Sequence, residues 1–191
     1  MKKVIKFFLV TISAAVLFTA CSNEDNPVDP NDPGTGNGDP EIQIPKSLKI
    51  DSIVLWQFPT TKPNGDKWDY SVFPNSPTRR PDIYVVLVKS GNHPPVFTSD
   101  IREDAELENA YSYFAFNQPQ TSNSGSLPYN VPINETYDVN VWDDDGLSAD
   151  DWMGSVSISP SVEYKNDNAT HLYKTITSGG IKVEIQGRWV Y

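Results

Sequence analysis

The sequence predicts an all-β domain, an eight-stranded antiparallel β-sandwich, that follows a signal peptide and a tether. Short runs in which apolar and polar residues alternate recur along residues 48–191. The 16 prolines and 11 glycines of the chain indicate frequent turns between those runs. Aromatic residues make up 12% of the chain, which is enough to fill the core of one domain.

Six segments have the pattern of strands. Residues 82–88 form an almost continuous apolar run, typical of a buried strand, and the other five alternate with period two. One or two further strands between Val96 and Phe116 complete the expected count. The only candidate helix is the segment from Ser99 to Asn109, whose shortness and charge favour a single solvated turn. The six strand segments are 48–56, 82–88, 137–142, 154–158, 173–176 and 181–185.

The first twenty residues predict export. A basic start with three lysines precedes an apolar run from Phe7 to Phe18. That run of about 12 residues is too short to cross the ~30 Å hydrocarbon layer of a membrane. A basic start, a short apolar core and a small residue before the cleavage point are typical of a secretory signal peptide. We therefore expect residues 1–20 to be removed.

Cys21 is the only cysteine in the chain, which excludes an intramolecular disulfide. Its position after the apolar run, in Leu17-Phe18-Thr19-Ala20-Cys21, resembles the lipobox of bacterial lipoproteins. The resemblance implies that Cys21 becomes the lipid-bearing, palmitate-carrying N-terminus of a protein anchored in the bacterial outer membrane. Ordinary secretion with an incidental cysteine is the alternative.

A polar segment separates the anchor from the domain. Residues 21–44 are rich in Asp, Asn, Pro and Gly, and such a composition predicts a disordered linker. The pair Glu24-Asp25 is similar to the export signal of surface lipoproteins in Bacteroidetes, which implies display at the cell surface. Residues 45–191 then remain as one domain, which we expect to be monomeric.

The charge of the chain excludes one class of partner. Residues 1–20 contain three of the 15 basic residues and none of the 25 acidic ones, so the mature chain carries a formal charge of −13. Nucleic acid phosphates repel such a protein, and so do anionic lipid headgroups unless a metal ion intervenes. We expect no nucleic acid partner.

The strongest functional signal is the stretch 141–154, where five aspartates crowd a turn between two strands. Like charges this close repel one another, so a bound cation would stabilise the turn. Ca²⁺ takes 6–8 oxygen ligands, which carboxylates and backbone carbonyls supply. Zinc and copper are disfavoured because the chain offers a single cysteine and only two histidines, His93 and His171.

An EF-hand does not explain this loop. An EF-hand needs acids at positions 1, 3 and 5, glycine at 6 and glutamate at 12. With Gly146 at the sixth position, Val141 would be first and Trp152 twelfth. Neither residue offers a carboxylate, so the EF-hand is excluded.

The spacing instead resembles the third calcium loop of C2 domains, Val-x-Asp-x-Asp-x₅-Asp-x-x-Gly. A second segment, Pro81-Asp82-Ile83-Tyr84-Val85, is similar to the Asp-Pro-Tyr-Val motif of the family's first loop, with Ile83 at the proline position. A further first-loop acid is Asp66 or Asp69. We prefer Asp69 because Trp-Asp followed by Pro-Asp-x-Tyr resembles bacterial members of the family. Either acid requires a longer first loop through 73–77. The third-loop pattern falls on Val141, Asp143, Asp145, Asp151 and Gly154.

The resemblance implies a C2-type sandwich whose first and third loops meet at one end and bind Ca²⁺. Its ligands would be Asp69, Asp82, Asp143, Asp145 and Asp151. Two other acids of the third loop, Asp144 and Asp150, are expected to point outward as solvated charges. Trp68 and Trp152 lie in the two loops, where they either pack beneath the loops or contact a membrane or a sugar.

The function that follows is calcium-dependent docking of a partner, which could be a membrane phospholipid, a glycan or another surface protein. The alternative is a structural or adhesive subunit of a surface complex, in which calcium only rigidifies the loops. We expect no enzymatic activity and no catalytic residues, because the sequence contains neither a G-x-S-x-G nucleophile motif nor a glycine-rich phosphate loop. Glycoside hydrolysis by paired carboxylates remains a third hypothesis.

Overall fold

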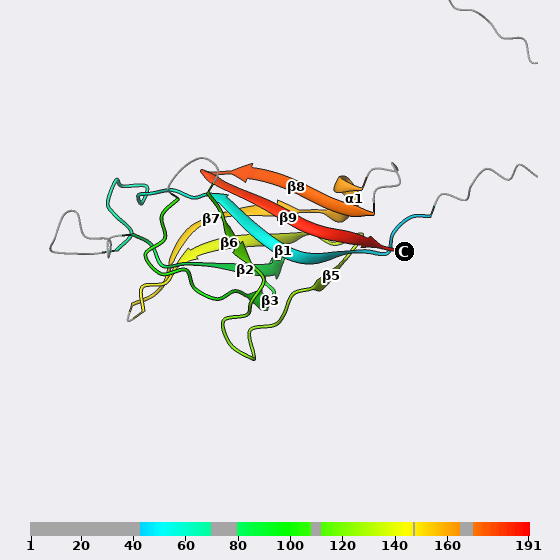
Figure 1. Ribbon diagram of the computed structural model, residues 1–191, viewed down its shortest axis with the longest axis horizontal. Coiled ribbons are helices and arrows are strands. Elements are labelled where there is room, and N and C mark those ends of the chain that lie inside the picture. The colour runs from blue at the N-terminus through cyan, green and yellow to red at the C-terminus, as the bar shows by residue number, and fades with distance from the viewer. Residues whose placement is uncertain (1–42, 70–79, 108–111, 147, 165–169) are drawn as a thin grey trace, which may run out of the picture. The chain divides into compact units, whose positions relative to one another are not determined.

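The computed structural model describes residues 43–69, 80–107, 112–146, 148–164 and 170–191. Cys21, the signal peptide 1–20 and all but the last two residues of the linker lie outside the described residues, as does the expected loop extension at 73–77. The described residues form two antiparallel sheets, in agreement with the predicted fold class (Figure 1). No helix among them is long and apolar enough to cross a membrane.

The first sheet has the strand order β4-β1-β9-β8, and β5 also pairs with β1. All of its pairings are antiparallel. Its strands are β1 (Ser47–Gln57), β4 (Phe114–Phe116), β5 (Tyr129–Pro132), β8 (His171–Ser178) and β9 (Ile181–Val190).

The second sheet has the order β3-β2-β6-β7 and is also antiparallel. A single short helix, α1 (Pro160–Glu163), follows its last strand. The strands of this sheet are β2 (Ile83–Lys89), β3 (Pro95–Thr98), β6 (Tyr137–Asp143) and β7 (Asp151–Ile158).

The described residues form nine strands rather than eight because one sheet edge is divided. β4 pairs with residues 53–55 of β1, and β5 pairs with residues 47–50 of the same strand. The two short strands thus share one strand position beside β1. Each sheet then has four strand positions, which accounts for the predicted total.

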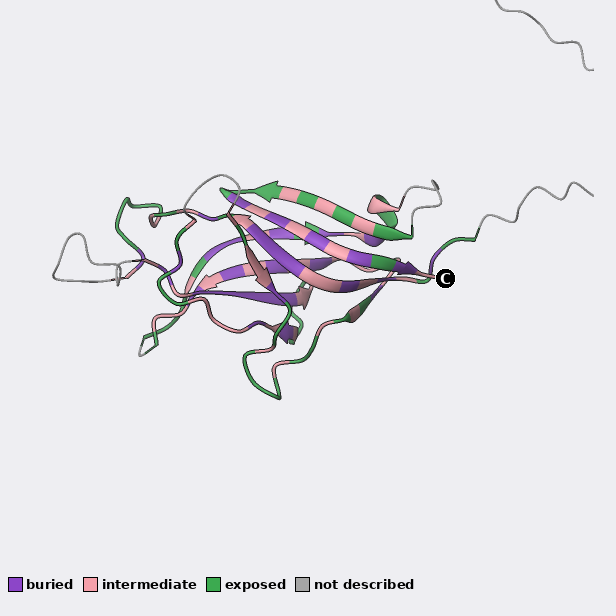
Figure 2. Cartoon of the chain, in the orientation of Figure 1, coloured by how far each residue is buried: buried purple, intermediate pink, exposed green. Residues whose placement is uncertain are grey.

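The core lies between the two sheets (Figure 2). Alternation places it there: along β6, Tyr137, Val139 and Val141 are buried, while the residues between them are half-buried on the outer face. β9 alternates in the same way from Ile181 to Ile185. β8 is exposed along most of its length, as expected for a strand at a sheet edge.

The segment 99–107, most of the candidate helix, contains no helix. Ser99 is fully buried, and its Oγ accepts a hydrogen bond from the Val85 N–H at 2.9 Å instead of capping a helix. Arg102 forms an antiparallel bridge with Ile83. Hydrogen bonds to β2 and to the two residues before it thus replace helical hydrogen bonds and bring the segment beside the start of that strand.

The acidic loops lie at the end of the sandwich opposite the point where the described chain begins (Figure 1). The Lys46 N–H donates to the Val190 carbonyl at 2.7 Å, so the start of β1 and the end of β9 lie together. β2 starts, β6 ends and β7 starts at the other end, where a Cβ on Gly154 would meet Ile181 at the start of β9.

Candidate calcium site

Asp143 lies at the centre of the acidic end, the end of the sandwich that contains the acidic loops. It is the last residue of β6, and its cross-strand partners are Ile83 on β2 and Asp151 on β7. The inward alternation of β6 continues through this residue, so a carboxylate occupies a core position and is fully buried. Burying a carboxylate is costly unless it is paired, hydrogen-bonded or bound to a metal ion.

Asp82 joins the two predicted loops. Its backbone N–H donates to Asp143 Oδ1 at 2.8 Å, and its carbonyl accepts from the Asp144 N–H at 2.8 Å. Its own Oδ1 accepts from the Asp104 N–H at 2.6 Å. Asp104 has a left-handed backbone, with φ of 47°. The first-loop segment 81–85 therefore lies directly against the end of β6, as the C2 resemblance implied.

Three of the five predicted ligands come together. Asp69, Asp143 and Asp145 each offer a carboxylate oxygen, and these oxygens lie within 4.8 Å of one another. Asp66, the alternative to Asp69, is exposed and accepts a hydrogen bond from the side chain of Asn64 at 2.7 Å. The structure thus brings Asp69, and not Asp66, to the third loop.

One carboxylate oxygen of Asp143, Oδ2, is the main indication of a cation site. While Oδ1 accepts from the Asp82 N–H, Oδ2 is buried and has no hydrogen-bond partner among the described residues. Burial raises the pKa of Asp143 to about 7, and the neighbouring Asp69 and Asp145 also raise it. A divalent cation beside Oδ2 would offset the free-energy cost of burying this carboxylate and its repulsion by Asp69 and Asp145.

The other two acids of the cluster are perturbed in the same direction. Burial, followed by the charges of Asp82 and Asp145, raises the pKa of Asp69 to about 6. The pKa of Asp145 is raised by burial and by the charge of Asp151. For both acids burial is the largest cause and the neighbouring carboxylate charges add to it, an arrangement that a bound hard cation would stabilise.

Asp151 is paired with a lysine. The ammonium group of Lys62 contacts Asp151 Oδ2 as an ion pair, and it also lies 5.7 Å from the ring centroid of Trp68. The hydrogen bond to Asp151 raises the pKa of Lys62, and the charges of Asp145 and Asp143 add to the effect. The positive charge of Lys62 therefore neutralises part of the negative charge of the acidic end.

The remaining residues of the two loops have separate roles. Trp68 is buried, and its Nε1–H donates to the Pro59 carbonyl at 2.7 Å, so it packs beneath the first loop. Trp152 is 58% exposed on β7. Asp144 Oδ1 accepts from the Gly146 N–H, and Asp150 Oδ2 accepts from the Tyr84 hydroxyl at 2.6 Å. The last two acids thus lie outside the cluster of three, and Asp150 is tied to β2.

Sequence reasoning missed Lys62 and Asp104. Lys62 is separated from Asp151 by 89 residues, and Asp104 from Asp82 by 22. Neither lies in a motif of the C2 pattern. Their only sequence signal is a position in loops that the topology brings to the same end of the sandwich.

Comparisons by sequence find no relatives: no protein-family model and no curated protein matches the chain. Solved structures with a similar arrangement include human GIVD cytosolic phospholipase A2 in complex with methyl gamma-linolenyl fluorophosphonate, at 12% identity and a TM-score of 0.44. The match covers 78% of this chain and 18% of the phospholipase chain, so this protein spans less than a fifth of that chain's length.

Two synaptotagmin-related structures also match. A single C2 domain of plant extended synaptotagmin 1 has 11% identity and a TM-score of 0.41, over 78% of this chain and 97% of that chain. A calcium-bound structure of two C2 domains of extended synaptotagmin 2 has 14% identity and a TM-score of 0.39, over 76% of this chain and 46% of that chain.

Proposed function

We propose that this chain is a lipid-anchored bacterial surface protein whose sandwich is a calcium-binding module of the C2 type. The observation that carries the proposal is the Asp143 carboxylate. It is fully buried, one of its oxygens has no partner among the described residues, and it belongs to a group of three acids within 4.8 Å. A calcium ion bound by these oxygens would supply the missing partner.

The donor set fits calcium better than other metals. The clustered groups are three carboxylates, from Asp69, Asp143 and Asp145, and the cluster contains no histidine or cysteine. Hard oxygen donors of this kind suit Ca²⁺, whose 6–8 ligands include carbonyls and water. Asp82 and Asp151 flank the cluster and complete the proposed ligand set, Asp151 after it leaves Lys62.

The proposed role of calcium is electrostatic and conformational. Two positive charges on the acid cluster would reverse the repulsion among its carboxylates and hold the first loop against the third. A phospholipid, glycan or surface protein could then dock at this end without facing an uncompensated negative charge. The described chain begins at the end of the sandwich opposite the acid cluster. We propose binding and no catalysis.

Calcium titration of the purified protein tests the proposal. We expect saturable heat release and a higher melting temperature, with a Kd of about 10⁻⁴ to 10⁻³ M, the range of extracellular calcium modules. Asp143→Asn should abolish both effects. Asp66→Asn is the matched control, because it removes the same charge from an exposed turn outside the cluster. Absence of saturable binding up to about 10 mM calcium would refute the proposal.

A purely structural role is the second candidate. The Asp82–Asp143 hydrogen bond already joins the two loops, so calcium could strengthen this connection without creating a docking face. In that case calcium would raise the melting temperature while vesicles of phosphatidylserine, glycans and surface proteins all failed to bind in its presence.

A further inference from the structure

The outer face of β2 is unusually apolar. Tyr84 and Val86 alternate with the core residues Ile83, Val85 and Leu87, so they point away from the core, yet they are only 9% and 8% exposed. The outer face of an antiparallel sheet is normally polar where it meets water. The neighbouring strands and turns bury these side chains by rising on either side, so β2 forms the floor of a groove.

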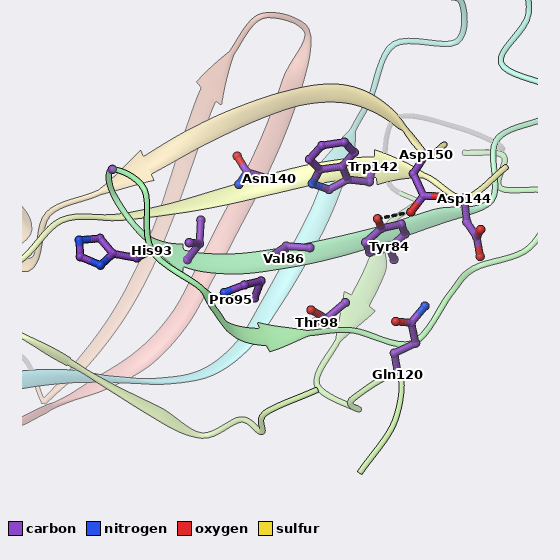
Figure 3. A pocket seen from close by; sticks show the side chains of 12 residues that line it. Tyr84, Val86, His93, Pro95, Thr98, Gln120, Asn140, Trp142, Asp144 and Asp150 are labelled. Carbon is purple, nitrogen blue, oxygen red and sulfur yellow. Dashed lines mark hydrogen bonds between the residues drawn. The ribbon is translucent and has the colours of Figure 1, made fainter. Parts of the chain in front are cut away.

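The groove has the size of a ligand site. Its volume is about 460 Å³, within the range of small-molecule pockets. Figure 3 shows Asn140 and Trp142 of β6 along one wall and Gln120 and Thr98 along the other. His93 lies at one end of the floor, and Tyr84 lies near the other end with the two acids Asp144 and Asp150.

We propose that this groove binds a neutral oligosaccharide. A sugar ring has apolar C–H faces and a rim of hydroxyl groups, so it needs both an aromatic surface and groups that donate and accept hydrogen bonds. Trp142 and the apolar floor supply the surface. The amides of Asn140 and Gln120 can donate and accept, and the carboxylates of Asp144 and Asp150 accept from hydroxyls.

Charge and polarity favour a neutral sugar over a lipid. No lysine or arginine is among the described residues that line the groove, and two carboxylates are. An anionic headgroup or phosphate would therefore be repelled. An acyl chain would cover the amides and carboxylates without offering them hydrogen-bond partners, which is costly.

A second tryptophan extends the aromatic surface. Trp152 on β7 is the cross-strand partner of Trp142, and directly opposed residues of an antiparallel pair project from the same face. Trp152 is 58% exposed and is not among the residues that line the groove. An exposed aromatic side chain on the strand next to Trp142 offers surface for a further sugar unit, so we expect oligosaccharides to bind more tightly than monosaccharides.

The two acids at one end of the groove, Asp144 and Asp150, lie in the same loop as Asp143 and Asp145 of the proposed calcium site. Asp144 lies between Asp143 and Asp145, and Asp150 precedes Asp151. The Tyr84 hydroxyl donates to Asp150 Oδ2 at 2.6 Å, so the loop is tied to the groove floor. If the proposed calcium site exists, calcium should tighten sugar binding by holding Asp144 and Asp150 in place. That dependence rests on the proposed function, whereas the groove itself does not.

Binding to an array of neutral oligosaccharides tests the inference. The purified protein would be applied to gluco-, galacto-, manno- and N-acetylglucosamine-containing tetraoses to hexaoses, and hits would be quantified by titration with calcium and with EDTA. We expect at least one neutral oligosaccharide to bind with a Kd of about 1 mM or tighter. Trp142→Ala should weaken binding by about tenfold or more, and Gln120→Ala should weaken it several-fold.

Gln120→Ala keeps the test valid if Trp142→Ala fails to fold, because Gln120 is exposed. Tyr173→Ala is the control, since it removes a 70% exposed aromatic side chain from β8 in the other sheet and should leave binding unchanged. The proposal is overturned if no neutral oligosaccharide binds, or if binding is unaffected by both groove variants. Binding of phosphatidylcholine vesicles, lost in Gln120→Ala, without sugar binding would also overturn it.

The two proposals fail separately. Calcium binding is measured by titration without sugar, and sugar binding is measured in EDTA as well as in calcium. Sugar binding that survives in Asp143→Asn, with calcium binding lost, supports the groove independently of the metal. Calcium binding without any sugar binding leaves the calcium module intact and refutes the groove.

Discussion

The ammonium group of Lys62 is paired with the carboxylate of Asp151 at the edge of the acid cluster. The charges of Asp145 and Asp143 also act on Lys62 and raise its pKa. The chain therefore supplies one positive charge of its own to the region where we propose a calcium ion. A calcium ion must displace or tolerate this charge, so Lys62 is expected to weaken calcium binding.

Lys62→Gln should tighten calcium binding. A unit charge about 5 Å from a divalent cation in a water-like dielectric opposes binding by about 1.5 kcal/mol, which corresponds to roughly tenfold in Kd. Without calcium the variant should be less stable, because Asp151 loses its partner. Calorimetric titration measures the first effect and thermal unfolding in EDTA the second. Lys67→Gln is the matched control, since Lys67 is exposed in the same loop; equal Kd values for the two variants would contradict the prediction.

Asp82→Asn separates metal binding from loop structure. Asparagine keeps an Oδ1 that accepts from the Asp104 N–H, and the backbone N–H that donates to Asp143 is unchanged. We therefore expect the melting temperature in EDTA to stay within about 2 °C of that of the wild type, since both hydrogen bonds of this half-buried residue are kept. Calcium affinity should fall by about tenfold or more if Asp82 is a ligand. Unchanged affinity would remove Asp82 from the ligand set.

Much of the fold could be predicted because alternation and burial agree along the long strands. β6 and β9 alternate along nearly their whole length, and the apolar run 83–88 reflects a strand with little exposure on either face. The sequence pattern does not predict β5, because Tyr129-Asn130-Val131-Pro132 contains a proline and only Val131 is buried. The candidate helix at 99–109 depends on Ser99 as a cap, whereas Ser99 forms hydrogen bonds with the backbone of Val85 on β2.

Sequence analysis could predict only those residues of the candidate site that fall in a motif with a defined spacing. The third-loop pattern led to Asp143 and Asp145, and the structure places both in the cluster of three acids. The choice between Asp66 and Asp69 depended on how a long loop folds back, which a spacing pattern cannot determine. Lys62 and the groove on β2 arise from tertiary contacts between distant segments, so no local signal indicates them.

Stability without calcium should fall as the pH rises. The pKa of Asp143 is about 7 and that of Asp69 about 6 in the folded protein, against about 3.8 for an unperturbed aspartate. Between pH 4 and pH 7 the folded state thus binds more protons at these groups than the unfolded state does. Stability from these protons is complete below about pH 4 and is lost as the pH rises through 6 and 7.

Thermal unfolding in EDTA from pH 5 to pH 8 measures this dependence. We expect the melting temperature to decrease across this window and the decrease to be smaller in Asp143→Asn, which cannot ionise at that position. With excess calcium the sign should reverse, because protons and calcium compete for the same carboxylates. A melting temperature in EDTA that rises with pH, or that has the same slope in Asp143→Asn, would show that these acids do not ionise as the geometry implies.

Two glycines with left-handed backbones should differ sharply in their tolerance of a side chain. Gly65 has φ of +89°, and a Cβ there would meet nothing within 4 Å. Gly125 has φ of +75°, and a Cβ there would lie 1.9 Å from the Val96 carbonyl oxygen, on the backbone of β3 beside the groove. Both substitutions incur backbone strain, but only Gly125→Ala also forces two backbone segments apart.

We therefore expect Gly65→Ala to lower the free energy of unfolding by roughly 1–2 kcal/mol, the cost of a left-handed backbone for an L-residue. Gly125→Ala should cost about 3 kcal/mol or more, because the overlap adds to that strain. Urea unfolding of the two variants measures the difference. The Thr98 N–H donates to the Ser124 carbonyl at 2.8 Å, which should hold β3 against residue 125. Equal costs for the two variants would show that β3 moves away from residue 125 easily and that this wall of the groove is not rigid.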